Sequence, residues 1–324
     1  MRVLVTGGSG FVGSHVVDRL RARGAFVRNY DRRESPHHPA GTLDTVLGDV
    51  NDVPTLASAL HGIDTVVHVA AVADVNEVVK DLPGADEGNV RGTLAVLEAA
   101  RLAGVRRVVY TSTIWVYSNS PGPLVDEDTA LGLPDHFYTA TKLAGEMYVR
   151  SFCELHGLEH TILRLGIPYG PRARDGAVVP IFVRKALEGE PLTIAGGGRQ
   201  SRRFVFVEDL ADGIARAVEP QARDRVYNLV GDEDVTVLQI AEVVRDLVGD
   251  VTIDHVDGRA ADFAGAVVSG ERARTELGWA ATTSFADGVA AYLDWYLAEH
   301  PALAPQRAAE PVGVAAGPWR ADER

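Results

Sequence analysis

Short hydrophobic runs alternate with longer amphipathic stretches through the first half of the chain. The runs are almost wholly apolar, which is typical of parallel strands buried on both faces of a sheet. The predicted strands are Val3–Thr6, Phe26–Tyr30, Val46–Asp49, Thr65–Ala71, Arg107–Ser112 and Thr161–Leu165. The stretches between them space their apolar positions as helices do, and the predicted helices are Val12–Arg23, Val53–Leu60, Val90–Ala103 and Tyr138–His156. This alternation predicts an α/β fold built on a doubly wound parallel sheet.

The pattern loosens after about Leu165. Gly166–Ala177 is rich in Gly, Pro and Arg and is predicted to be a loop. Helices are predicted at Val179–Gly189, Glu208–Val218, Leu238–Val248 and Phe285–Ala298, and strands near Thr193, at Val226–Leu229 and at Val251–His255. Residues 301–324 are rich in Ala, Pro and Arg without an amphipathic period, so we expect a mobile end there.

Composition narrows the function classes. The chain has 324 residues, of which 46% are hydrophobic and 24% charged, as in ordinary globular proteins. Its formal net charge of −13 argues against binding to nucleic acid or to anionic membranes, which need a dense cationic surface. The longest apolar stretch, Ile63–Ala73, is too short to span a bilayer, and Met1 leads directly into the first strand. We therefore expect a cytoplasmic location.

Cysteine usage limits the metal and redox chemistry. Cys153 is the single cysteine of the chain, which leaves no internal disulfide and no cysteine-based zinc cluster. A lone cysteine on a predicted helix is expected to fill the core. The sequence therefore predicts no metal site.

Glycines cluster where the first predicted strand turns into the first predicted helix. Gly7, Gly10 and Gly13 permit a tight turn and let the backbone approach a pyrophosphate, which the free N–H groups of the helix N-terminus can bind. This strand–turn–helix context predicts a dinucleotide-binding, Rossmann-type site. Its predicted contacts in the turn are Gly7, Gly10, Phe11, Val12 and Gly13.

The next predicted strand is followed by a carboxylate. Asp31 stands where an acidic residue accepts hydrogen bonds from the adenosine ribose and repels a 2′-phosphate, which favours NAD. Arg32 and Arg33 follow directly and could instead bind that phosphate, or could be solvated loop charges. NAD is the predicted cofactor, with Arg32 among its contacts.

A tyrosine and a lysine share one face of a later helix. Tyr138 and Lys142 are four residues apart, and the chain has only three lysines. A free tyrosine ionises at about pH 10, but a nearby ammonium and a positively charged nicotinamide ring both favour the phenolate. Thr111–Thr113 ends the preceding strand, at the sheet edge where doubly wound sheets bind ligands. These residues predict a proton-transfer site; the alternative is a structural tyrosine beside a solvated lysine.

Together these residues resemble the extended short-chain dehydrogenase/reductases, specifically the NAD-dependent nucleotide-sugar epimerase/dehydratase group, over about residues 1–300. Besides the glycine turn, Asp31 and the Tyr138/Lys142 pair, the landmarks are Gly48–Val50, His68–Ala71, Asn89 with Gly92 and Thr93, Thr111–Tyr117 and Tyr169–Arg172. The resemblance implies a Rossmann-type fold with a smaller C-terminal substrate-binding domain. It places the NAD-binding domain at 1–165 and the substrate domain at 166–300, with parts of about 204–230 returning to the first.

The resemblance also implies roles by position. Thr113, Tyr138 and Lys142 match the catalytic residues, and Thr113 and Tyr138 would also contact the substrate. Further cofactor contacts are implied at Asp49, Val50, Val69, Ala70, Ala71, Asn89, Thr111, Ser112, Tyr138 and Lys142. Arg202 and Arg259 match the arginines that hold the nucleotide diphosphate; alternatively, they are surface charges in an arginine-rich chain.

Two departures from the family pattern bear on the reaction. Ile114 and Trp115 follow Thr113, where the 4,6-dehydratases have an Asp-Glu pair that carries out the elimination. Ile167 stands where an Asn often helps to hold the phosphates. Without a second acid–base pair, the resemblance favours a transient oxidation, namely C4 epimerisation of a UDP-hexose through a 4-keto intermediate.

Two other functions stay open. One is an NAD(P)-dependent oxidoreductase or dehydratase that acts on a sugar nucleotide or another hydroxy or keto compound. The other is a non-catalytic dinucleotide sensor, which would not need Thr113, Tyr138 and Lys142. The expected ligand is a nucleotide-diphosphate sugar, with no nucleic acid and no membrane. The family further implies a homodimer formed by helices at about Asn89–Ala103 and Tyr138–His156.

Overall fold

The computed structural model describes residues 1–198, 200–249, 251–256 and 267–303. Within these ranges the centre is a seven-stranded sheet in the order β11-β7-β5-β4-β1-β2-β3, and every neighbouring pair is parallel. Its strands are β1 (Arg2–Thr6), β2 (Phe26–Asp31), β3 (Asp44–Leu47), β4 (Thr65–His68), β5 (Arg107–Thr113), β7 (Glu159–Leu165) and β11 (Arg225–Leu229). The strand order reverses between β1 and β4, which confirms the predicted doubly wound α/β fold.

Strand β1 shows why the runs are apolar throughout. Successive side chains point to opposite faces of a strand. Val3 and Val5 lie in one buried cluster, whereas Leu4 lies in the cluster on the other face. Both faces of the sheet are therefore buried, so no polar alternation is needed.

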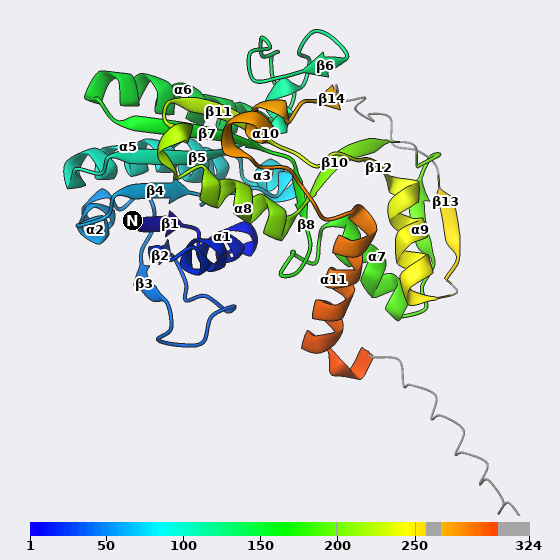
Figure 1. Cartoon of the computed structure of the whole chain (residues 1–324). Helices are drawn as coiled ribbons and strands as arrows, with labels where there is room; N and C mark the ends of the chain where they lie inside the picture. Colours follow the sequence, from blue (N-terminus) through cyan, green and yellow to red (C-terminus); the bar gives the residue numbers. More distant parts are fainter. Residues whose placement is uncertain (199, 250, 257–266, 304–324) are drawn as a thin grey trace, which may run out of the picture.

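Helices cover the two faces separately (Figure 1). The cluster of Val3 and Val5 includes side chains of α1 (Phe11–Ala22), α8 (Val207–Arg216) and α10 (Glu271–Leu277). The cluster of Leu4 includes side chains of α2 (Val53–Ala59), α5 (Gly92–Ala103) and α6 (Phe137–His156). Helix α8 packs against α1, and β11 extends the sheet beyond β7, so parts of the second half join the first.

A smaller unit follows β7 and has its own core. It contains a three-stranded sheet in the order β12-β10-β8 and the parallel pair β13-β9. Three helices pack on these strands, and the aromatic side chains of Tyr169, Phe204, Phe206 and Phe285 meet in this core. The bounds are β8 (Ile167–Tyr169), α7 (Val178–Leu187), β9 (Leu192–Ala195), β10 (Ser201–Phe206), β12 (Asp234–Thr236), α9 (Val237–Val248), β13 (Ile253–Val256) and α11 (Phe285–Glu299).

Short elements complete the described chain. They are α3 (Val75–Lys80), α4 (Leu82–Asp86), the π-helix η1 (Glu87–Arg91), the 3₁₀ turns η2 (Ile114–Tyr117), η3 (Pro220–Ala222) and η4 (Pro301–Leu303), and the two-stranded pair β6 (Leu124–Val125) and β14 (Val267–Val268). None of the helices in the described ranges combines the length and the apolar character that a membrane crossing requires.

Several local predictions need correction. The predicted strand at Val46–Asp49 is shifted, because the chain leaves the sheet at Gly48, whose backbone packs against the Tyr30 ring. The predicted loop at Gly166–Ala177 contains strand β8. Strand β10 was not predicted at all. The expected mobile end lies outside the described residues except for η4, and the proposed domain boundaries stay a prediction.

Candidate active site

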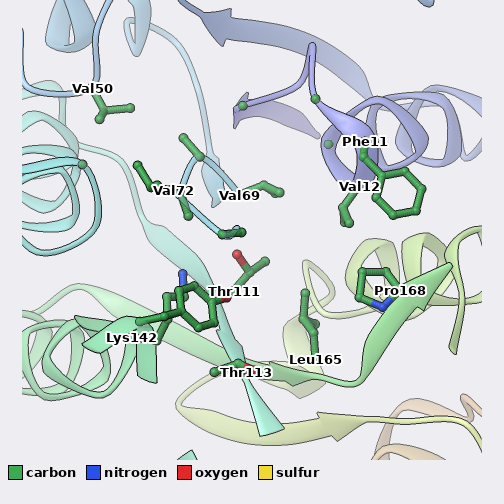
Figure 2. Close-up of a pocket in the computed structure, with 18 of the residues that line it drawn as sticks. Phe11, Val12, Val50, Val69, Val72, Thr111, Thr113, Lys142, Leu165 and Pro168 are labelled. Atoms are coloured by element: carbon green, nitrogen blue, oxygen red, sulfur yellow. The ribbon is translucent and has the colours of Figure 1, made fainter. Parts of the chain in front are cut away.

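One large cavity, of about 920 Å³, lies at the carboxyl ends of β1, β4 and β5. Its walls come from the glycine turn, the ends of the central strands, the start of α6 and the segment around β8. Figure 2 shows Lys142, Thr111 and Thr113 on one side of this opening, and Phe11 and Val12 on another. The cavity thus brings residues near position 10 together with residues beyond position 165.

The glycine turn requires residues without a Cβ atom. Gly7 has φ +74°, a left-handed conformation that favours glycine, and a Cβ there would come within 2.8 Å of the Ala70 backbone. A Cβ on Gly13 would collide with the Gly7 carbonyl oxygen. Helix α1 begins at Phe11 directly after this turn, and its first residues, whose N–H groups have no partner within the helix, line the cavity. The turn fits a pyrophosphate.

Asp31 ends β2 at the rim of the same cavity. Its carboxylate accepts hydrogen bonds from the backbone N–H groups of Ser9 (3.1 Å) and Arg33 (3.3 Å). A carboxylate has about four acceptor positions, so it can still accept ribose hydroxyls. Asp49 also lines the cavity, and its backbone oxygen accepts a hydrogen bond from the Tyr30 hydroxyl at 3.0 Å. With the glycine turn, this rim fits the adenosine half of a dinucleotide.

Tyr138 and Lys142 project into the cavity from the first turns of α6. Burial lowers the pKa of Lys142 to about 7, and the carboxylate of Glu146 opposes that shift. The Lys142 ammonium lies over the Tyr110 ring. Lys142 therefore loses its proton more easily than a solvent-exposed lysine.

Burial shifts the pKa of the tyrosine in the opposite direction. It raises the pKa of Tyr138 to about 12, and the cation that opposes the shift is Arg174, not Lys142. Burial disfavours any charged form, and here it outweighs the attraction of the Arg174 guanidinium. The chain alone keeps Tyr138 protonated at neutral pH, so the phenolate needs a further positive charge in the cavity.

Thr113 stands at the junction of β5 and η2. Its hydroxyl accepts a hydrogen bond from the backbone N–H of Trp115 (3.3 Å), which caps the 3₁₀ turn. The indole of Trp115 meets the ring of Tyr138 edge to face, with the centroids 6.3 Å apart. The hydroxyl of neighbouring Ser112 is buried and has no protein partner. The strand end therefore offers polar groups to a ligand between β5 and α6.

Sequence comparison identifies the family. The profile of the NAD-dependent epimerase/dehydratase family matches residues 3–230. The chain belongs to this family. Its cofactor is accordingly NAD, and the turn, Asp31 and the strand-end hydroxyls are the groups that fit it.

Individual members of the family are similar over most of their length. The chain is 33% identical to a UDP-glucose 4-epimerase of Mycolicibacterium smegmatis, over 91% of this chain and 98% of that protein. It is 30% identical to a UDP-N-acetyl-alpha-D-glucosaminuronate decarboxylase of Bacillus cytotoxicus, over 76% and 80% of the two chains. The solved structure of MoeE5 in complex with UDP-glucuronic acid and NAD superposes with a TM-score of 0.84 at 32% identity, over 92% and 100% of the two chains.

The chain is accordingly an enzyme of this family. The two named relatives act on sugar nucleotides, and they differ in the reaction. The cavity contains most of the residues that the sequence singled out. They are Gly7, Gly10, Phe11, Val12, Gly13, Asp31, Arg32, Asp49, Val50, Val69, Ala70, Ala71, Thr111, Ser112, Thr113, Tyr138 and Lys142. Their assigned roles stay predictions.

Two predicted site residues lie away from the cavity lining, and a third lies outside the described residues. Asn89 does not line the cavity; its amide bonds both backbone groups of Val72 and the Thr141 hydroxyl. Arg202 lies on β10, away from the cavity wall, and donates to the backbone oxygen of Ser201. Arg259 lies outside the described residues. Of the two proposed diphosphate arginines, Arg202 is therefore not part of the described cavity lining, and the role of Arg259 stays a prediction.

One cation of the site was not predicted from the sequence. Arg174 lines the cavity near Tyr138, and its guanidinium pairs with Asp74 at 2.8 Å. The predicted loop at Gly166–Ala177 was rich in arginine, but no periodicity indicated which arginine faces the site. Apolar lining comes from the same region, from Leu165, Ile167 and Pro168.

Proposed function

We propose that this protein catalyses the C4 epimerisation of a UDP-hexose through a transient 4-keto sugar. The proposal rests on the composition of the cavity wall formed by β5, η2 and α6. This wall contains Thr113, Tyr138 and Lys142. Among the described residues, the carboxylates of the lining are those of Asp31, Asp49 and Glu87, none of which lies on these elements.

That distribution of acids favours one reaction class. Elimination of water needs a base at C5 and an acid at the leaving hydroxyl. Ile114 and Trp115 follow Thr113 in the chain, and neither has a titratable side chain. Oxidation and reduction at a single carbon need only one proton acceptor. Epimerisation therefore fits this set of residues better than dehydration.

The chain's own residues hold and move one proton. The Tyr138 phenolate takes the proton of the sugar 4-hydroxyl, and the hydroxyl of Thr113 orients that oxygen. Bound NAD⁺ supplies a hydride acceptor for C4 and a positive ring that favours the phenolate. The Lys142 ammonium adds a second positive charge beside Tyr138. When the sugar has turned over, the Tyr138 hydroxyl returns the proton to O4.

Product analysis without added coenzyme tests this function. The protein is incubated with UDP-glucose, UDP-galactose, UDP-glucuronate and their N-acetyl analogues, and the products are separated and weighed by mass spectrometry. We expect an isomer of unchanged mass and NAD that stays with the protein. A mass change of two hydrogens or one water that needs added coenzyme would instead identify the oxidoreductase or dehydratase. Retained NAD with no conversion of any hydroxy or keto compound would favour the dinucleotide sensor.

We also propose a homodimer formed by α5 and α6. These two helices pack on each other and carry exposed apolar side chains. They are Leu94 and Leu102 on α5 and Met147, Tyr148 and Leu155 on α6. A second copy would bury these side chains. The cytoplasmic location expected from the sequence stays a prediction.

A further inference from the structure

A buried arginine behind the active site has three side-chain hydrogen bonds. Arg164 is on β7, with 2% of its side chain exposed. Its Nε and Nη2 groups donate to the two carboxylate oxygens of Glu146 at 3.0 and 2.8 Å. Its Nη1 group donates to the Tyr117 hydroxyl at 2.7 Å. The guanidinium thus holds two separate side chains in one rigid plane.

The two partners belong to the two elements that carry the proposed catalytic residues. Glu146 lies on α6, four residues after Lys142 and eight after Tyr138, so the three share one face of the helix. Tyr117 is the last residue of η2, the turn that Thr113 caps. Arg164 therefore joins the catalytic helix to the turn that holds Thr113.

Tyr117 is also bound on the side away from Arg164. The Tyr117 hydroxyl donates to Asn228 Oδ1 on β11 at 2.9 Å, and the Asn228 amide donates to the backbone oxygen of Ser269 at 2.9 Å. Glu146, Tyr117 and Asn228 are all buried. A buried network whose groups are all bonded has few alternative arrangements. Rotation of Tyr117 or Arg164 would break several of these bonds at once.

We propose that Arg164 is a positioning residue of this enzyme, which sets the spacing of Thr113 from Tyr138 and Lys142 by binding Glu146 and Tyr117 together. The inference rests on the proposed function where it concerns sugar turnover. Arg164 does not line the cavity, so its effect is exerted through the elements it joins. A loss of this junction shifts α6 relative to η2 and leaves the ligand walls otherwise complete.

The charges around the catalytic pair matter for the test. Glu146 on α6 is the carboxylate that favours the ammonium of Lys142, while the Tyr110 ring of β5 lies beneath that ammonium. His68 of β4 is buried and stays neutral, because burial lowers its pKa to about 3. Arg174 faces Tyr138 from the segment after β8. A change that frees Glu146 from Arg164 therefore alters the field at Lys142 and Tyr138.

A second ion pair with a buried arginine provides a control. Arg107 begins β5, at the end of the strand opposite to Thr113, and both its Nε and Nη2 groups bond Glu159 Oε2. Its side chain is 3% exposed, close to that of Arg164. Replacement of either arginine by lysine keeps the charge and loses the two-pronged geometry. The two variants should therefore lose similar stability but differ in catalysis.

The first experiment compares Arg164→Lys, Tyr117→Phe and Arg107→Lys as purified proteins with their bound NAD. We expect kcat for the UDP-hexose to fall about 10- to 100-fold in Arg164→Lys and by less in Tyr117→Phe, because misplaced catalytic groups slow the reaction steeply. The KM should change less than twofold in both. Arg107→Lys should keep the kcat of the unchanged protein. Equal falls in kcat for Arg164→Lys and Arg107→Lys would overturn the proposal, as would an unchanged kcat in a folded Arg164→Lys or, if that variant does not fold, in Tyr117→Phe.

A second measurement needs no sugar substrate. Tyrosine labelled with ¹³C at the ζ carbon reports ionisation by NMR in the NAD-saturated protein, and Tyr138→Phe assigns the signal. We expect the Tyr138 titration to move to higher pH in Arg164→Lys and Tyr117→Phe and to stay in place in Arg107→Lys. If the sugar assay shows no epimerase but this shift occurs, the proposed reaction fails and the positioning role stands. If the titration does not move in the Arg164 and Tyr117 variants, the positioning role fails.

Discussion

The ammonium of Lys142 lies 4.5 Å from the centroid of the Tyr110 ring, which joins α6 to β5 directly behind the cavity. The ring face attracts the cation and partly replaces the water that burial removes. The compensation is incomplete, since the pKa of Lys142 still falls to about 7. The fold therefore maintains this lysine at a cost in stability.

Replacement of Lys142 by methionine should expose that cost. The unfolded lysine has a pKa near 10.5, so the native state binds fewer protons and stability falls as the pH drops from 10.5 to 7. Lys142→Met should therefore raise the free energy of unfolding at pH 6 by about 2–4 kcal/mol, while activity is lost. Urea unfolding at pH 6 and at pH 10 measures this, and the gain should shrink at pH 10. A variant that is less stable than the unchanged protein at pH 6 would contradict this account.

Tyr138→Phe should separate catalysis from cofactor binding. The ring and its packing against Trp115 are retained, while the proton acceptor is lost. We expect kcat to fall about 10²- to 10⁴-fold with NAD still bound. The control is Tyr148→Phe on the same helix, whose side chain is exposed. A folded Tyr138→Phe variant that releases NAD would argue against the proton-transfer assignment.

Arg174→Gln should shift the pH dependence of the reaction. The guanidinium lowers the pKa of Tyr138, so its removal raises that pKa. Activity needs the phenolate and is lost as the pH falls through this pKa, so the acid limb of kcat/KM should move to higher pH. Because Arg174 is about half exposed and paired with Asp74, a shift of a few tenths of a pH unit is expected. Arg184→Gln on α7 is the control, and an acid limb that moves equally there would rule out a local effect.

Gly13→Ala should abolish tight NAD binding. The added methyl group would collide with the Gly7 carbonyl oxygen, so the turn must open where the pyrophosphate would bind. The matched control is Gly176→Ala, because a Cβ at Gly176 meets nothing within 4 Å. We expect Gly13→Ala to be purified without NAD and to unfold at lower temperature, and Gly176→Ala to behave as the unchanged protein. Full NAD content in Gly13→Ala would show that the turn is not the binding element.

The proposed dimer predicts a change of mass in solution. Leu94→Glu combined with Met147→Glu places charges on the exposed faces of α5 and α6, and we expect a monomer by light scattering. Leu47→Glu on β3 is an equally exposed apolar position outside these helices and should leave a dimer. If the protein without substitutions is already a monomer, the proposed dimer interface is wrong.

The sequence by itself determined the central sheet and most of the cavity. The glycine turn, Asp31 and the Tyr138/Lys142 spacing are local features, because strand and helix geometry fixes where residues a few positions apart will point. Apolar runs such as Val3–Thr6 identify strands buried on both faces without any knowledge of their neighbours. These rules act over one element, so they could be applied before the fold was known.

Only the tertiary structure decided what depends on distant neighbours. Strand β8 contains Pro168. A strand tolerates proline here because, among the described residues, β8 is the edge of its sheet and pairs only with β10. Asn89 bonds Val72 and Thr141, and Arg174 faces Tyr138, through contacts between segments far apart in the chain. The direction of the Tyr138 pKa shift follows from burial, which no spacing reveals. Burial and contacts with distant residues exist only in the folded chain, and they determine the pKa values of the site residues.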